Sequence, residues 1–233
     1  MHFYNRNNIN LFRIIYLYLA SFAMTTDKFV VSCDKDAVYL SRDKANHMFL
    51  IEFRAHNPKI RIDVLLTFDI YKMMYELNKD LFDSHHIAYP DPTDPSRAEI
   101  LFIFKSIMGL GERYTHVYTH MPHLHQSQSQ LQQSQNQTQV IQISSANVPK
   151  TGDDASSLRH MIPKRAEQID SDNSNITIHV QPDGHTIQFH YKFKLQMSKP
   201  DDMIAIPPFV DKAISTMMKT IFVRMKQFIE CLG

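Results

Sequence analysis

Residues 175–197, NITIHVQPDGHTIQFHYKFKLQM, contain the clearest local structure in the chain. The turn-forming Pro182-Asp183-Gly184 separates two runs in which apolar and polar residues alternate, and this pattern predicts a β-hairpin with one buried face. An isolated hairpin is marginally stable, so we expect it to join another sheet or to pack on a helix. In the second run one face carries Ile187, Phe189, Tyr191, Phe193 and Leu195, and the solvated face carries Gln188, His190, Lys192 and Lys194.

The amino-terminal half begins with a strand pattern. Residues 28–68 contain four short runs that are rich in β-branched and aromatic residues and are separated by polar turns. These runs predict a four-stranded antiparallel meander with one buried face. In the last of the four, Ile60, Ile62, Val64 and Leu66 share the apolar face.

Two helices are expected after the meander. Apolar residues at 70–82 recur every three or four positions, which predicts an amphipathic helix that covers the sheet. Residues 83–94 are interpreted as a loop. Asp94 as an N-cap and Pro95 at the first helical position predict a second, largely buried helix, which Gly109 or Gly111 would end.

The last element predicted is a long amphipathic helix over residues 208–231. A wide, methionine-rich apolar face usually packs against a core. The excess of Lys and Arg on its polar side keeps a second interpretation open, in which the helix docks on a partner protein or a membrane surface. The contacts expected in that case are Phe209, Met217, Ile221, Met225 and Phe228.

The first 24 residues carry few charges. Arg6 and Arg13 are the only charged side chains before Asp27. The apolar run after Arg13 is shorter than the about 20 residues that a spanning helix needs, so we interpret it as a short anchor or interfacial helix. A cleaved signal peptide and an upstream extension that ends before Met24 are the alternatives. The predicted membrane contacts are Ile14, Ile15, Tyr16, Leu17, Tyr18 and Leu19.

Histidine and then glutamine dominate the middle of the chain. His116, His120, His123 and His125 are candidate zinc ligands, but no thiolate or HExxH pattern accompanies them. Polar histidines in a loop or at a strand edge are therefore the preferred interpretation. The tract QSQSQLQQSQNQTQ at residues 126–139 predicts a disordered linker. Arg159, Lys164 and Arg165 form a small basic group that we interpret as a solvated face.

Composition excludes several classes of protein. The 233 residues are 43% hydrophobic and 21% charged, with 25 Lys and Arg against 24 Asp and Glu. The near-neutral balance argues against a dedicated nucleic-acid-binding protein, and the two cysteines argue against a disulfide framework. There is no glycine-rich nucleotide-binding motif and no Gly-x-Ser-x-Gly motif. We therefore expect no enzymatic activity and no cofactor.

The chain resembles a family of viral proteins. The apolar amino end, the segment HHIAYPDPTDPSRAEILFIFKSIMGL at residues 85–110, the Gln/Ser tract and the terminal helix together resemble the nucleopolyhedrovirus core-gene family of open reading frame eighty-one. The resemblance implies a non-enzymatic baculovirus protein of virion morphogenesis that supports nucleocapsid envelopment and budded-virus production. It also implies contacts with membranes and with viral or host proteins, including actin, in the cytoplasm and nucleus of the infected cell or in the virion.

These observations combine into one expectation. The fold class is α+β, with an antiparallel meander packed with amphipathic helices, a disordered insert, and a carboxy-terminal hairpin and long helix. The expected segments are residues 1–24, 25–125, 126–172 and 173–233, and the last either stands alone or completes the first domain. The alternatives to a viral assembly protein are a soluble interaction or regulatory domain and a metal-binding protein that uses the histidine cluster. An oligomer is left open, and no nucleic-acid partner is expected.

Overall fold

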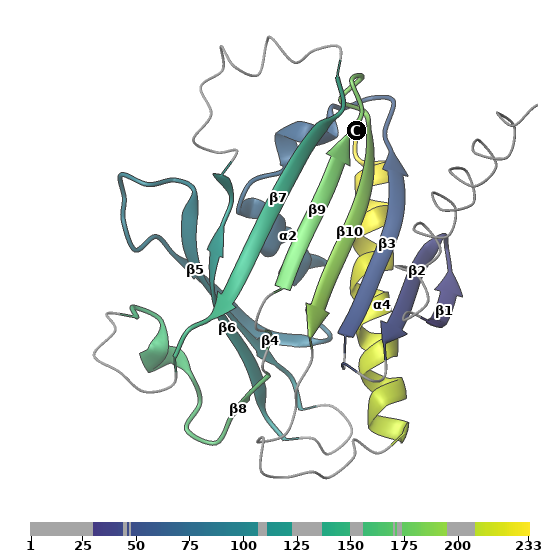
Figure 1. The fold of residues 1–233 in the computed structure, drawn as a ribbon. Coiled ribbons are helices and arrows are strands. Elements are labelled where there is room, and N and C mark those ends of the chain that lie inside the picture. Colours follow the sequence, from purple (N-terminus) through teal and green to yellow (C-terminus); the bar gives the residue numbers. More distant parts are fainter. Residues whose placement is uncertain are drawn as a thin grey trace, which may run out of the picture.

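A computed structural model describes residues 30–43, 46, 48–106, 111–122, 137–149, 156–169, 171, 174–194 and 208–233. Within these ranges the chain forms a single, mainly antiparallel sheet that is packed against two α-helices (Figure 1). The α+β class that the sequence predicts is therefore confirmed. The predicted amino-terminal and apolar segments before residue 30 lie outside the described residues.

The sheet pairs strands that are far apart in the chain. Its order is β1-β2-β3-β10-β9-β7-β6-β5-β4, and the two-residue β8 pairs in parallel with β6. β10, the last strand in the chain, thus pairs with β3, the third strand of the amino-terminal meander. The bounds are β1 Val30–Lys35, β2 Val38–Asp43, β3 Met48–His56, β4 Phe82–Ala88, β5 Arg97–Phe104, β6 Arg113–His120, β7 Gln139–Asn147, β8 Glu167–Gln168, β9 Ser174–Val180 and β10 Thr186–Lys194.

The predicted hairpin is confirmed as β9 and β10. Gly184 in its turn has a φ of 68°, which favours glycine, and a Cβ there would lie 2.8 Å from the Arg61 Nε atom. β10 then pairs with β3 along its whole length, from Thr186 opposite His56 to Lys194 opposite Met48. The hairpin therefore completes the sheet that the amino-terminal strands begin, and no separate sheet forms around it.

The long final helix is also confirmed, as α4 (Pro208–Cys231). It crosses one face of the sheet over β1, β2 and β3 and also contacts the shorter helix α2 (Asp69–Leu77) (Figure 1). Its carboxy-terminal end is tied down by buried Asn57, whose Nδ2 atom donates to the carbonyls of Ile229 at 2.7 Å and Leu232 at 2.8 Å. Arg224 adds an ion pair with Asp80, which follows α2.

The predicted second helix is wrong, because residues 97–104 form the strand β5. Ala98, Ile100 and Phe102 face the main core, whereas Leu101 and Ile103 belong to a second apolar cluster on the opposite face. A strand that is covered on both faces has a continuous run of apolar residues. The spacing of apolar residues does not distinguish such a strand from a buried helix. Asp94, predicted as an N-cap, instead accepts a hydrogen bond from the Ser96 amide at 2.9 Å in a turn.

Other boundaries also differ from the expectation. The fourth strand of the predicted meander is a short 3₁₀ helix, Ile62–Leu65, in which Ile62 is buried and Val64 is 65% exposed. The first helix is shorter than predicted, because the segment from Phe82 onward, interpreted in part as a loop, forms β4. The range 126–172, interpreted as a linker, contains β7 inside the sheet and the 3₁₀ helix Arg159–Met161; residues 123–136 lie outside the described residues.

Candidate functional site

A cavity lies between the sheet and the two helices. Its volume is about 120 Å³, and its walls come from β4, β5, β6, β7, β9, β10, α2 and α4. Aliphatic and aromatic side chains make up most of the lining, among them Phe102, Val117, Ile176, Phe189 and Phe222. The lining residues that belong to strands alternate with residues of the outer face, so the two-residue period of a strand directs apolar side chains from several strands into one space.

Methionine side chains form the helical wall of the cavity. Met74 belongs to α2, and Met217, Met218 and Met225 belong to α4. Methionine is unbranched and adopts many rotamers, so such a wall adjusts to the shape of its contents. The space available to a ligand is therefore larger than the volume of the empty cavity, provided that these side chains change rotamer.

A few hydroxyl groups line the otherwise apolar cavity. Burial raises the pKa of Tyr71 to about 12, although hydrogen bonds with Thr119 and Ser145 lower it. Thr119 and Ser145 are themselves joined, with 2.9 Å between their hydroxyl oxygens. Burial also raises the pKa of Tyr191, and the neighbouring Tyr71 adds to that effect. Both phenols are therefore neutral near pH 7 and offer hydrogen bonds without a charge.

This arrangement suits one kind of ligand. Pockets for small molecules are usually lined by apolar side chains, and a few polar groups fix the orientation of the ligand. No charged side chain lines this cavity within the described ranges. The cavity therefore has the chemistry to hold a mainly apolar molecule with a single hydroxyl or carbonyl group, and it lacks the means to neutralise an ionic one.

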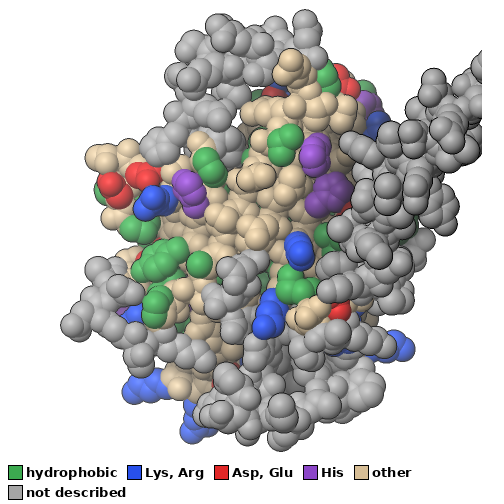
Figure 2. Space-filling model, viewed as in Figure 1, with side chains coloured by type: hydrophobic (Ala, Val, Ile, Leu, Met, Phe, Trp, Pro, Cys, Tyr) green, Lys and Arg blue, Asp and Glu red, His purple; other side chains and the backbone are tan. Residues whose placement is uncertain are grey.

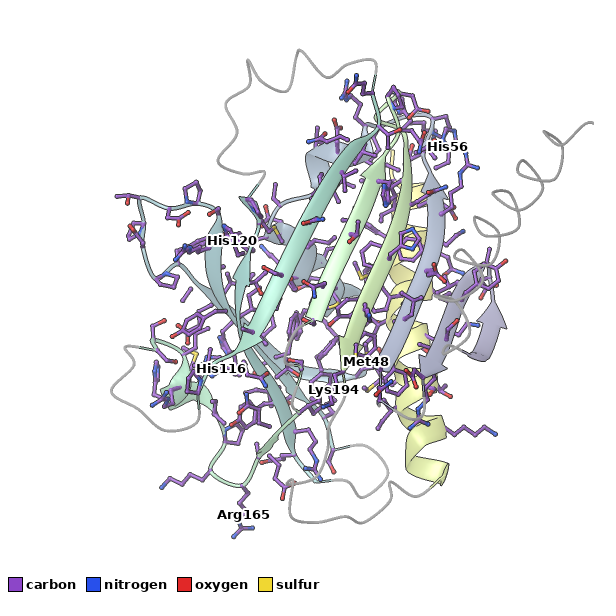
Figure 3. All side chains as sticks on the ribbon, viewed as in Figure 1. Met48, His56, His116, His120, Arg165 and Lys194 are labelled. Carbon is purple, nitrogen blue, oxygen red and sulfur yellow. The ribbon has the colours of Figure 1, made fainter. Side chains whose placement is uncertain are left out.

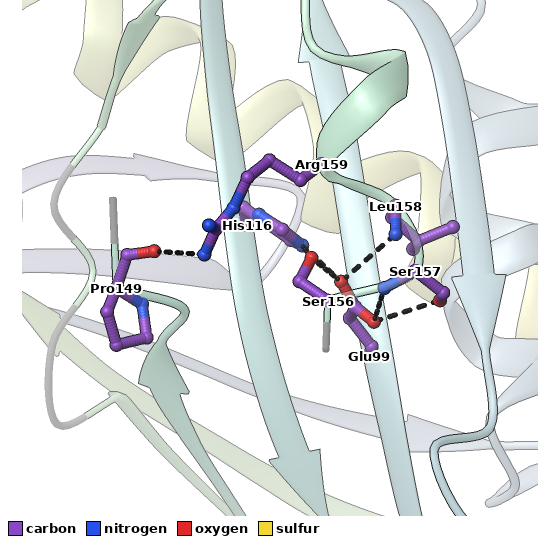
Figure 4. A network of polar contacts seen from close by, with 7 residues as sticks. All are labelled: Glu99, His116, Pro149, Ser156, Ser157, Leu158 and Arg159. Carbon is purple, nitrogen blue, oxygen red and sulfur yellow. Dashed lines mark hydrogen bonds and ion pairs between the residues drawn. The ribbon is translucent and has the colours of Figure 1, made fainter. Parts of the chain in front are cut away.

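A second polar centre lies on the opposite face of the sheet, around Glu99 of β5 (Figure 4). This side chain is 2% exposed. The His116 Nε2 atom lies 2.6 Å from Glu99 Oε1, and the Ser156 hydroxyl donates to the same oxygen at 2.5 Å. The Ser157 amide and hydroxyl donate to Oε2, each at 3.1 Å, and the Leu158 amide donates to Oε1 at 3.3 Å.

Hydrogen bonds favour the ionised form of Glu99. Burial alone would raise the pKa of its carboxyl group, but the hydrogen bonds from Ser156, His116 and Ser157 outweigh burial and lower the pKa below its ordinary value. Glu99 is therefore ionised near neutral pH. Its carboxylate holds residues 156–158 against β5 and β6.

The Glu99 centre does not have the geometry of a hydrolase triad, although Ser, His and Glu are the right residue types. In a triad the carboxylate and the nucleophile bind different nitrogens of the imidazole. Here the Glu99 carboxylate and the Ser156 hydroxyl both approach Nε2 of His116, and the hydroxyl is the more distant at 3.5 Å. Ser156 donates its proton to Glu99 instead, so this arrangement supplies no base for a serine nucleophile.

We call residues 156–168 the outer flap. The flap covers the outer face of β5 and β6, where Leu158 is buried with Leu101, Ile103 and Tyr114. Ile162 and Ala166 pack on the same cluster. Beyond the flap, Ile169 and Ser171 line the cavity on the other side of the sheet, so one segment of chain connects the two centres.

Two of the four histidines predicted as zinc ligands, His116 and His120, lie in the described part of the chain and do not converge. His116 and His120 both lie in β6, where four residues span about 13 Å, too far for one metal ion. His116 is buried beside Glu99, and His123 and His125 lie outside the described residues. Figure 2 shows histidines in more than one place on the outer face of the sheet. The described part of the chain contains no group of three metal-binding side chains that could hold an ion.

The predicted contact residues of the final helix lie mainly toward the sheet. Ile221 and Met225 are buried and line the cavity, and Met217 lines it as well. Phe228 is half-buried, and the side chain of Phe209 lies outside the described residues. The contacts predicted at residues 14–19 also fall outside them. Among the described helices, none is both long enough and apolar enough to cross a membrane.

Comparison with known proteins relates the fold to lipid-transfer domains. No family model and no curated protein matches the chain. The structure is similar to the human StarD13 (DLC2) lipid transfer and protein localization domain, with a TM-score of 0.58 and 11% identity over 99% of this chain and 100% of that one. It is also similar to human StAR-related lipid transfer protein 5, with a TM-score of 0.56 and 8% identity over 95% of both chains.

A bacterial structure has the same arrangement. The STAR-related lipid transfer protein fragment from Xanthomonas axonopodis has a TM-score of 0.54 and 11% identity, over 87% of this chain and 99% of that one. At this level of identity the similarity shows the fold alone, a sheet packed against a long carboxy-terminal helix. It does not by itself assign a ligand to this chain.

Sequence reasoning missed most of the residues that form the two centres. The alternation in residues 186–194 indicated which side of β10 is apolar, and Phe189, Tyr191 and Phe193 do line the cavity. Nothing local identifies the partners of Glu99, because they are 17 to 59 residues away in the chain. The usable signal was a single carboxylate within an apolar run, which suggests a buried partner.

Proposed function

We propose that the protein binds a lipid or another mainly apolar small molecule in the cavity between the sheet and α4. The observation that carries this proposal is the apolar cavity between the sheet and the two helices, with its neutral hydroxyl groups. The proteins with similar structures are named for lipid transfer, which supports the proposal. Binding, and no chemical conversion, is the activity that such a lining provides.

The size of the cavity limits what fits without rearrangement. An engineered cavity of about 150 Å³ is known to hold benzene, so about 120 Å³ accommodates one ring or a short part of an acyl chain. A whole lipid requires movement of the methionine wall. We therefore expect binding to be accompanied by displacement of side chains on α4, with the sheet largely unchanged.

Replacing Val117 with phenylalanine is expected to weaken ligand binding about tenfold. Val117 is buried on β6 and lines the cavity, so the added ring would occupy space that the ligand needs, and overpacking costs about 1–3 kcal/mol. The measurement is titration of the protein with a fluorescent fatty acid and with a fluorescent sterol.

The matched control is Val140→Phe, the same change at a residue of β7 that is 50% exposed. It is expected to leave binding unchanged. Equal affinity of the Val117 variant and the unmodified protein for every bound probe would place the ligand elsewhere. The absence of binding by the unmodified protein to both probes would reject the proposed ligand class.

The role in virus assembly stays a prediction. A lipid-binding cavity is compatible with a protein that acts at membranes, but the viral or host partners, actin among them, rest on the resemblance alone. Flotation of the full chain with vesicles, beside the chain that begins at Met24, measures the contribution of the amino-terminal segment. We expect the shorter chain to float less, and equal flotation would contradict the anchor interpretation.

A further inference from the structure

We propose that the tip of the outer flap, residues 159–165, is a docking surface for membranes that contain anionic lipids. Its sequence RHMIPKR contains three permanent cations and no acidic residue. His160, Lys164 and Arg165 are exposed, and Met161 between them is 39% exposed. Anionic headgroups attract basic side chains, and the interface below them accepts an apolar side chain, so this combination fits a bilayer surface.

Within the described part of the chain, the charges of Lys164 and Arg165 are available for docking. Glu167, the next acidic residue along the flap, forms an ion pair with Arg113. Glu112, whose carbonyl accepts the Glu167 amide, lies beside that pair. No ion pair or hydrogen bond joins Lys164 or Arg165 to another described side chain. Figure 3 shows Arg165 at the lower end of the fold, where it points away from the sheet.

The tip is held in a fixed position by the rest of the flap. The Glu99 carboxylate binds residues 156–158, and Ile162 packs inward on the second apolar cluster. Arg159 Nη2 donates to the Pro149 carbonyl at 2.8 Å. With Ile162 turned inward, Met161 is left on the outside. A surface that is ordered before binding loses less conformational entropy when it docks.

The position of the tip connects docking with the cavity. Ile169 and Ser171, which line the cavity, follow Arg165 by four and six residues. A bilayer bound at the tip would therefore lie beside the segment that forms part of the cavity wall. Docking itself depends on the flap alone and does not require that the cavity be occupied.

The test compares sedimentation of the full chain with vesicles of phosphatidylcholine alone and of phosphatidylcholine with phosphatidylserine. We expect the unmodified protein to prefer the anionic vesicles. The Lys164→Ala/Arg165→Ala variant should bind the anionic vesicles about 30-fold more weakly and the neutral vesicles equally well. Added salt should weaken binding of the unmodified protein to the anionic vesicles. Met161→Ser should also weaken binding to the anionic vesicles, because it removes the apolar contact.

The control is Arg54→Ala/Lys72→Ala, which removes two exposed cations from β3 and α2 and should leave vesicle binding unchanged. An unchanged preference for anionic vesicles in the Lys164/Arg165 variant would overturn the proposal, and so would an equal loss in the control.

A different outcome would assign the tip to nucleic acid. In that case the Lys164/Arg165 variant would bind single-stranded RNA more weakly than the unmodified protein does, while its binding to vesicles would be unchanged. Val117→Phe should retain vesicle binding, so failure of docking and failure of cavity binding are separable.

Discussion

Replacing Glu99 with alanine is expected to destabilise the protein by about 3 kcal/mol and to release the outer flap. The carboxylate is buried and accepts five hydrogen bonds, from His116, Ser156, Ser157 and Leu158. Alanine would leave the buried donors of His116 and Leu158 without this acceptor, and each unsatisfied buried group costs about 1–3 kcal/mol. Water that enters the space offsets part of this cost.

Two measurements check this result. Urea unfolding gives the loss of stability, and limited trypsin digestion reports the flap, which contains Arg159, Lys164 and Arg165 as cleavage sites. Cleavage in the variant should be faster than in the unmodified protein, because local opening exposes these bonds. Slow cleavage together with a large loss of stability would show that Glu99 supports the sheet but does not hold the flap.

The controls separate charge from volume. Glu99→Gln retains the shape of the side chain and one acceptor oxygen, so it should cost less than alanine. Glu76→Ala removes an exposed carboxylate of α2 that pairs with Lys79, just after the helix, and exposed pairs of this kind contribute little to stability. Equal unfolding midpoints for the Glu99→Ala and Glu76→Ala variants would contradict the central role of the Glu99 network.

Acid should weaken the same network. Because the folded-state pKa of Glu99 lies below its ordinary value, the ionised form favours folding. Its contribution is fully present above the unfolded pKa of about 4.3 and is lost as the pH falls through the folded pKa. The difference in stability between the unmodified protein and Glu99→Gln should therefore shrink as the pH falls below about 4, and a constant difference would contradict it.

Elements whose pattern is local were predictable from the sequence. The hairpin of β9 and β10 combines a Pro-Asp-Gly turn with strict alternation, and α4 combines a long apolar stripe with opposing polar residues. Both patterns follow from backbone geometry alone. The partner of the hairpin was not predictable, because the pairing of β10 with β3 joins residues about 130 positions apart, such as Thr186 and His56.

The second apolar cluster explains the main error. Leu101 and Ile103 are buried only because the flap packs over them, and the flap itself reads as a polar loop. A strand with one solvent-exposed face would alternate apolar and polar residues, and β5 does not, because the flap covers its second face. Neither the strand β5 nor the environment of Glu99 was therefore predictable, because both depend on the contact between β5 and the flap, which is distant in the chain.

The cavity was beyond sequence reasoning for a different reason. Its lining residues are of the same kinds as those that fill a solid core. A cavity remains because these side chains do not fill the whole space between the sheet and the helix. Whether a cavity remains depends on the local packing density, which is set by all the surrounding side chains together. The wide methionine-rich face of α4 was visible in the sequence, but it predicts a core and a ligand wall equally well.

Replacing Phe222 with alanine is expected to have the largest effect in the cavity, a loss of about 3–5 kcal/mol of stability. Phe222 of α4 is 3% exposed. Its ring centroid lies 5.5 Å from that of Phe189, 5.7 Å from that of Tyr191 and 6.5 Å from that of Phe53, so it joins the helix to β10 and β3. Alanine is the better helix former, so any loss reports packing and not helix propensity.

The same variant tests whether the enlarged space accepts an apolar ligand. Benzene at about 100 times its dissociation constant should restore about 2.7 kcal/mol of stability, because the cavity left by the ring adjoins the existing one. Phe222→Leu, which retains most of the volume, should lose less and gain less from benzene, and Gln227→Ala on the exposed side of α4 should change neither. If Phe222→Ala and Phe222→Leu unfold at the same urea concentration and benzene stabilises neither, the contact between α4 and the sheet is not organised around this cavity. Lipid binding in that space would then have no physical basis.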